Sequence, residues 1–261
     1  NEALEKRVDE AINLIASAQQ PDGYLNTYFI IVAPEKRWTN LMEGHELYCA
    51  GHLIEGAVAH YQATGKETFL TVARRFADLI DQIFGRGKKR GYPGHPEIEL
   101  ALVRLYQVTH EERYLALARY FIDERGVGEN IFIEECGRPK HSFIFPDMVH
   151  FKSDYFQTHM PVREQKRASG HAVRAMYLYS AMADLARLTD DHELAGACEK
   201  LYKNTIRRQM YVTGGVGSAK LGERFTVDFD LPSESAYSET CASIGLMLFS
   251  SRMWLLNQNK V

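Results

Sequence analysis

The sequence has no long hydrophobic run and no excess of basic residues. No stretch of its 261 residues approaches the length of about 18 consecutive apolar side chains that indicates a transmembrane helix. It has 31 Lys and Arg against 34 Asp and Glu, a net charge of −3, so it lacks the basic field that collects nucleic-acid phosphates. We therefore expect neither a membrane nor a nucleic acid among its partners.

Cysteine is also scarce. The four cysteines lie far apart and form no CxxC pair, which excludes a small disulfide-stapled secreted fold. The first residues show no basic segment followed by a short apolar core, so no signal peptide is indicated. We expect reduced thiols and a cytoplasmic location, although the chain does not begin with Met and a targeting segment could have been removed.

What the sequence does contain is a helical pattern along most of its length. With 45% hydrophobic and 25% charged residues it has the composition of a globular domain. Apolar residues recur at helical spacing, and Pro, Gly and Asx clusters interrupt them at intervals that suit helix pairs. We predict an all-α fold. The expected helices cover about 2–18, 43–62, 67–84, 95–108, 111–124, 170–188, 191–208 and 239–257.

Three of these helices end in the same kind of turn, at residues 63–67, 108–112 and 188–192. After each turn comes an aromatic or Leu anchor followed by an alanine-containing face, which lets neighbouring helices approach closely. The repeated unit is therefore a helical hairpin with a short loop. Repeated antiparallel hairpins form either an open solenoid or a closed α/α toroid.

The start of the first helix in each hairpin helps to separate these two architectures. Three of them begin with Gly44-His45, Gly94-His95 and Gly170-His171, and a fourth begins with Glu239-Thr240-Cys241. In a toroid the inner helices point the same way, so these starts would meet at one mouth around a common cavity. The alternative is that Gly-His is ordinary helix-start chemistry with no shared site.

Only four inner helices are recognisable, whereas a closed six-hairpin toroid needs six. The last one, through Leu246, Phe249 and Trp254, has no outer helix after it to cover its apolar surface. We therefore expect an (α/α)6 barrel that is incomplete at its C-terminal end.

Two acidic positions suggest chemistry. Glu239 and Cys241 offer a carboxylate and a thiolate, both zinc ligands, although residues two apart reach one ion only at a helix start or where the helix is locally irregular. Glu223 follows the glycine-rich segment 213–218 in a loop, where a carboxyl group could serve as a general acid. The alternatives are a buried structural cysteine beside a helix-start Glu, and a solvated loop Glu.

Other polar side chains have similar double interpretations. His45, Cys49 and His52 lie at i, i+4 and i+7, a spacing that suits metal ligands but equally a buried stripe in an apolar helix, which we favour. We interpret His45 instead as a hydroxyl-binding donor. Tyr24 and Trp38 are either an aromatic sugar platform or packing anchors.

Six motifs in order closely resemble the β-L-arabinofuranosidases of glycoside hydrolase family 127, over essentially the whole chain. They are Asp22-Gly23-Tyr24-Leu25-Asn26-Thr27, Gly44-His45-Glu46-Leu47-Tyr48-Cys49-Ala50-Gly51-His52, Gly91-Tyr92-Pro93-Gly94-His95, Gly170-His171-Ala172-Val173-Arg174, Thr213-Gly214-Gly215-Val216-Gly217 and Glu239-Thr240-Cys241-Ala242.

The resemblance implies a zinc-dependent retaining glycosidase that releases L-arabinose from β-L-arabinofuranosides, built on an (α/α)6 barrel followed by β-sandwich domains. Its zinc is held by one Glu and three Cys, and Glu239 and Cys241 match the Glu-x-Cys part of that set. Glu223 matches the general acid/base. His45, His95 and His171 match histidines that contact the sugar.

The chain departs from the family in one respect. The other two ligands, an adjacent Cys-Cys pair that includes the presumed nucleophile, have no counterpart because no cysteine follows Cys241. We expect residues 1–261 to be a partial catalytic domain without the sandwich domains, inactive by itself and weak in zinc binding. A small-molecule or oligosaccharide substrate is the expected partner, and a homodimer is compatible with the sequence.

Two other functions compete with this interpretation. One is a metal-independent toroid enzyme, such as an unsaturated-glycuronyl hydrolase or a sugar epimerase, which would use His and carboxylates. The other is a non-catalytic helical repeat that binds a partner on its concave face. Three Gly-His starts aimed at one mouth argue against the latter.

Overall fold

A computed structural model describes residues 1–138, 144–145, 148, 150 and 152–258, and this part of the chain contains helices but no β-strand beyond isolated bridges. The longer helices fall close to the expected ranges. They are α1 (Glu2–Ala18), α3 (Glu46–Thr64), α4 (Thr68–Ile83), α5 (Ile98–Thr109), α6 (Glu112–Glu124), α8 (Ala172–Thr189), α9 (His192–Arg208) and α10 (Thr240–Gln258).

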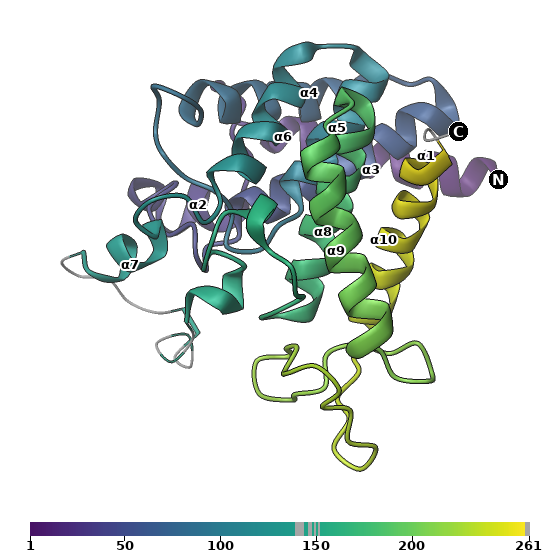
Figure 1. Cartoon of the computed structure of the whole chain (residues 1–261). Coiled ribbons are helices and arrows are strands. Elements are labelled where there is room, and N and C mark those ends of the chain that lie inside the picture. Colours follow the sequence, from purple (N-terminus) through teal and green to yellow (C-terminus); the bar gives the residue numbers. More distant parts are fainter. Residues whose placement is uncertain (139–143, 146–147, 149, 151, 259–261) are drawn as a thin grey trace.

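The helices form two layers of antiparallel hairpins (Figure 1). In the inner layer α3 packs on α5, α5 on α8, and α8 on α10. In the outer layer α4, α6 and α9 each pack on the inner helix that precedes them, and α1 packs on α4. This arrangement confirms the all-α, incomplete (α/α)6 barrel.

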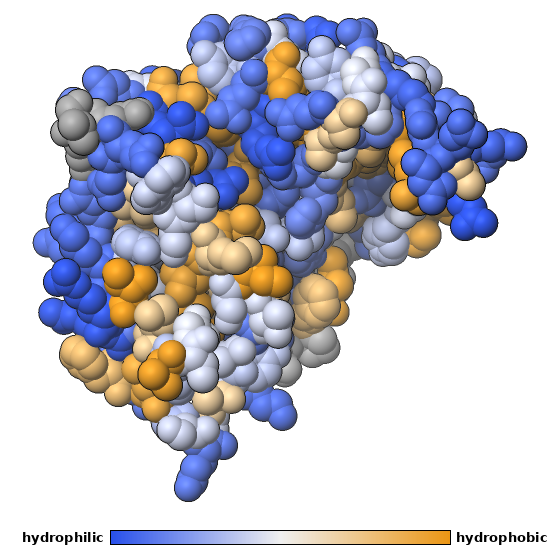
Figure 2. All heavy atoms as spheres, turned by 90° about the vertical axis from the view of Figure 1, so that its right-hand side faces the viewer, coloured by the Kyte–Doolittle hydropathy of each residue, from blue (hydrophilic) through white to orange (hydrophobic). Residues whose placement is uncertain are grey.

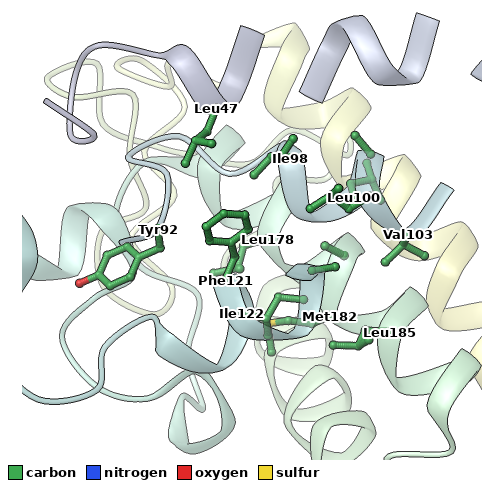
Figure 3. Packing of buried hydrophobic residues seen from close by; sticks show 14 of the residues in the cluster. Leu47, Tyr92, Ile98, Leu100, Val103, Phe121, Ile122, Leu178, Met182 and Leu185 are labelled. Atoms are coloured by element: carbon green, nitrogen blue, oxygen red, sulfur yellow. The ribbon is translucent and has the colours of Figure 1, made fainter. Parts of the chain in front are cut away.

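The core lies between the two layers. Figure 3 shows side chains of α3, α5, α6 and α8 interleaved there, among them Leu47, Phe121 and Leu178, all of which are buried. The alanines of the repeated face lie at close helix contacts, as predicted, since Ala77 and Ala118 have no exposed surface. Close packing of this kind fixes the inner helices relative to one another and therefore fixes their N-terminal ends.

Two helices keep apolar side chains in solvent. On α10, Met247 and Trp254 are 63% and 62% exposed, and on α1, Leu14 is 71% exposed. Figure 2, which views the side of the molecule where α1 and α10 lie in Figure 1, shows apolar side chains among the polar ones on this face. The apolar surface expected on the last helix is thus present and uncovered in the described part of the chain.

The inner helices α3 and α5 begin three residues later than expected, and the reason is local. His45 has a left-handed backbone (φ 55°) and Pro96 follows His95, so regular helix starts only beyond them. The glycines permit close backbone approach: a Cβ on Gly94 would lie 1.9 Å from the Met42 carbonyl oxygen, and one on Gly170 2.2 Å from that of Asp154. The backbone therefore passes very close to another segment of the chain at both Gly94-His95 and Gly170-His171.

Several short helices were not expected. Among the fully described elements they include α2 (Thr27–Ile31), α7 (Ile131–Cys136) and 3₁₀ turns at Pro34–Lys36, Ser153–Phe156 and Val162–Glu164. None of the helices in the described ranges is long and apolar enough to cross a membrane.

Candidate active site

The three histidines of the Gly-His dipeptides lie together where α3, α5 and α8 begin. The ring centroids of His45 and His95 are 6.2 Å apart, and those of His95 and His171 are 5.6 Å apart. His95 and His171 are buried and His45 is half-buried. The ends of three inner helices thus supply one cluster, as a toroid requires.

The hydrogen bonds of these rings define their protonation. The Nδ1 atoms of His45 and His95 face the carbonyl oxygens of Glu43 and Pro96, the latter at 2.8 Å. Burial lowers the pKa of His45, and burial together with the Arg174 charge lowers that of His95 well below 6.5. A neutral ring that donates from Nδ1 leaves Nε2 as an acceptor, to which a sugar hydroxyl can donate. The expectation that His45 is a hydroxyl-binding donor is therefore wrong in direction, because the Glu43 carbonyl takes its N–H.

His171 has the opposite tautomer. As the N-cap of α8, its Nδ1 accepts from the Arg174 backbone N–H at 3.2 Å, so the proton of the neutral ring is on Nε2. Burial and then the charge of Arg174 lower the pKa of His171 to about 4, although the Glu223 carboxylate opposes them. Its Nε2 lies 3.1 Å from Glu223 Oε2, and the uncharged ring therefore donates to that oxygen.

Glu223 is held by its backbone and by both of its carboxylate oxygens. Its carbonyl accepts from the Ala172 N–H at 2.9 Å, which ties the turn to the start of α8. The Tyr237 hydroxyl donates to Oε1 at 2.7 Å, opposite the His171 contact. The side chain is still 41% exposed. A fixed and accessible carboxyl group of this kind suits proton transfer.

Arg174 and Arg224 support this arrangement from two sides. The buried guanidinium of Arg174 lies 5.1 Å from the Tyr155 ring centroid. Arg224, directly after Glu223, forms an ion pair with Asp154 at 2.7 Å. The Arg224–Asp154 ion pair thus holds the residue next to Glu223 against the segment of Asp154, and Arg174 contacts the aromatic ring of the adjacent Tyr155.

Glu239 directly precedes α10 and Cys241 is the second residue of that helix, so the pair lies at a helix start. Burial and a hydrogen bond with Glu239 raise the pKa of the Cys241 thiol to about 12. Glu239 Oε2 is buried without a hydrogen-bond partner. An orphaned carboxylate oxygen beside a thiol fits a cation, since the charge would satisfy that oxygen and ionise the thiol.

These two residues supply only part of a metal site. Within the described ranges no group of three or more His, Cys, Asp or Glu side chains is placed to hold a metal. The His45–Cys49–His52 stripe does not form one either: His45 contacts the Glu43 carbonyl, and His52 lies 3.4 Å from Glu97. The pair at α10 therefore fits half of a tetrahedral zinc site.

Sequence reasoning missed the tyrosines of the site. Tyr48 and Tyr177 contact the His95 ring edge-on, with centroids 4.5 Å and 5.7 Å away. Burial, and after it the charge of Glu97, raises the pKa of both tyrosines. Tyr237 contacts Glu223. Helical spacing from the Gly-His histidines could have suggested Tyr48, and proximity to Glu239 could have suggested Tyr237.

The aromatic pair predicted as either a sugar platform or packing anchors belongs to the core. Tyr24 is fully buried and Trp38 is 8% exposed, and their rings pack edge-to-face at 5.2 Å. Glu46 joins them by accepting from the Tyr24 hydroxyl and, at 2.7 Å, from the Trp38 N–H. They support α3 and do not line the histidine cluster.

Surface cavities lie elsewhere. One of about 560 Å³ lies between α4 and α6, and one of about 690 Å³ is lined by residues between Asp154 and Ser169 together with Lys200. Neither contains a histidine of the cluster. We assign the candidate site by its converging polar groups, because neither cavity is lined by the histidine cluster or by Glu223.

Comparisons with known proteins agree with this geometry. Residues 1–260 match the model of the β-L-arabinofuranosidase GH127 catalytic domain. A non-reducing end β-L-arabinofuranosidase from Bifidobacterium longum is 44% identical over 256 residues, which are 96% of this chain and 39% of that protein.

Two solved structures are also similar. A GH127 β-L-arabinofuranosidase from Geobacillus stearothermophilus T6 has a TM-score of 0.94 and 53% identity, over 98% of this chain and 40% of that one. A second GH127 β-arabinofuranosidase has a TM-score of 0.87 and 40% identity, over 99% and 39%. The chain thus spans about two fifths of the length of these relatives. The resemblance seen in the sequence motifs is confirmed, and the chain belongs to glycoside hydrolase family 127, the β-L-arabinofuranosidase family.

Proposed function

We propose that this chain provides the sugar-binding and proton-transferring part of a zinc-dependent retaining glycosidase that releases L-arabinose from β-L-arabinofuranosides. The observation that carries the proposal is the Glu223 carboxylate, fixed between His171 and Tyr237 beside two further neutral histidines. Membership of family 127 and the names of the relatives support the substrate.

In this proposal Glu223 is the acid and base. It protonates the glycosidic oxygen as the bond to the leaving group breaks, and later removes a proton from the attacking water. The His171 and Tyr237 donors keep both carboxylate oxygens in place during these steps, while the exposed part of the side chain admits the substrate.

His45 and His95 bind sugar hydroxyl groups in this proposal. Each ring is neutral and has an unprotonated Nε2, so each accepts a hydrogen bond from a hydroxyl without the desolvation cost of a charged group. The faces of Tyr48 and Tyr177 around His95 provide an apolar wall for the sugar ring.

Glu239 and Cys241 would hold the zinc ion, with the orphaned Glu239 oxygen as one ligand atom. When bound, zinc supplies a positive charge that keeps coordinating thiols ionised at neutral pH. The adjacent Cys-Cys pair of the family does not occur in residues 1–261, so this chain offers two of four donors.

The proposal is tested with the full-length gene product. We expect it to hydrolyse 4-nitrophenyl β-L-arabinofuranoside and to leave the α-anomer and unsaturated glucuronides intact, with a β-configured first product detected by NMR. Cleavage of an unsaturated glucuronide without action on the arabinoside would favour the metal-independent toroid enzyme.

His95→Ala should weaken substrate binding. Loss of one hydrogen bond worth about 0.5–1.5 kcal/mol raises KM roughly 2- to 10-fold, and we expect a smaller change in kcat. Steady-state kinetics with circular dichroism checks this. His192→Ala is the matched control because His192 lies on α9 with a side chain 85% exposed. An unchanged KM in His95→Ala would show that His95 has a structural role and does not bind the substrate.

A further inference from the structure

The loop between α9 and α10 joins the turn of Glu223 to the segment that leads into α10. The Tyr237 N–H donates to the Ser218 carbonyl at 3.2 Å, and the Ser238 N–H to the Gly217 carbonyl at 3.0 Å. These two bonds place the Tyr237 ring beside the Glu223 turn, and its hydroxyl reaches Oε1 at 2.7 Å. The two oxygens of Glu223 therefore have one donor each, from different parts of the chain.

The two donors differ in what they can do. His171 Nδ1 accepts from the Arg174 N–H, so Nε2 carries the only proton of the neutral ring and can donate but not accept. The Tyr237 hydroxyl can rotate and both donates and accepts. An acidic proton on Oε2 would face the His171 N–H, whereas one on Oε1 finds an acceptor in Tyr237.

From this asymmetry we infer that Oε1 of Glu223 is the oxygen that gives and takes the catalytic proton, and that Tyr237 is the residue that positions it. The inference rests on the proposed function. As Glu223 loses its proton to the leaving-group oxygen, the Tyr237 hydroxyl turns to donate to the new carboxylate, and it turns back when Glu223 takes a proton from water. No net proton passes through Tyr237, and His171 holds Oε2 throughout.

Tyr237→Phe tests the inference because it removes only the hydroxyl group. With methyl β-L-arabinofuranoside, whose leaving group needs protonation, we expect kcat to fall about 10- to 100-fold, the effect of losing a hydrogen bond to a charged group. With the 4-nitrophenyl substrate, whose leaving group departs without a proton, kcat/KM should fall less than about threefold. KM should stay close to that of the wild type for both substrates.

The matched control is Tyr211→Phe. Tyr211 lies in the same loop, and its exposed hydroxyl donates to the Pro232 carbonyl at 3.3 Å, away from Glu223. We expect wild-type kinetics from this variant. Tyr237 is half-buried, so Tyr237→Phe should fold, which thermal unfolding of both variants checks.

Equal losses on both substrates would show a merely structural role for Tyr237 and overturn the inference. Unchanged kinetics of Tyr237→Phe would overturn it as well. Either result combined with an inactive Glu223→Gln would leave the proposed function standing, whereas a fully active Glu223→Gln would overturn the proposed function itself.

Discussion

Glu223→Gln is expected to lower kcat on methyl β-L-arabinofuranoside by about 10²- to 10⁴-fold, the usual contribution of a general acid/base. The amide keeps the shape of the side chain and still accepts from one donor, but it cannot deliver or remove a proton. Loss of kcat/KM should be smaller on the 4-nitrophenyl substrate, since only its second step needs Glu223. Steady-state kinetics on both substrates measures this difference.

Added azide should restore turnover of the 4-nitrophenyl substrate by Glu223→Gln, because an anionic nucleophile needs no general base. The azide product should keep the β configuration. Glu234→Gln is the matched control, as Glu234 lies in the same loop and is exposed. Turnover of Glu223→Gln near the wild-type rate would remove this residue from the mechanism.

Glu239→Gln and Cys241→Ser should each lower both zinc content and activity. Loss of a direct ligand should cost at least about 100-fold in metal affinity, because even partners outside the coordination sphere are worth 10- to 100-fold. Inductively coupled plasma mass spectrometry of the purified full-length gene product gives zinc per chain, and kcat is measured on the same samples.

Cys49→Ser is the control for this pair, since Cys49 is an exposed thiol on α3 outside the proposed ligand set. It should keep both its zinc and its activity. A wild-type enzyme that contains no zinc and works unchanged in a chelator would contradict the proposed metal dependence and would favour metal-independent chemistry.

Long helices were predictable from the sequence because their apolar periodicity extends over several turns. The range expected at 2–18 is α1 itself, and α9 begins one residue after its expected start. The short helices α2 and α7 were not predicted, because five or six residues span too few turns to show an apolar periodicity. Their signal was in the caps: the Asn26 and Asn130 side chains accept from the N–H groups of Phe29 and Phe132.

The site was predictable only in part. The repetition of Gly-His at equivalent positions was enough to predict that the three histidines lie together. In a toroid the inner helices point the same way, so their N-terminal ends meet at one end of the barrel. The tautomers depend on neighbouring carbonyls and on a helix N-terminus, which sequence spacing does not encode. Tyr237 reaches Glu223 only through the backbone pairing of residues 217–218 with 237–238, a tertiary contact within an irregular loop.

The uncharged state of the histidine rings has a consequence for the acidity that the site tolerates. A free imidazole changes its charge near pH 6.5, but the pKa of His171 is about 4 and that of His95 is well below 6.5. Both rings therefore stay neutral, each with one ring proton, from mildly acidic to neutral medium. Under the proposed function, a sugar hydroxyl at His95 and the Glu223 carboxylate at His171 therefore keep the same hydrogen-bonding partners when the medium becomes moderately acidic.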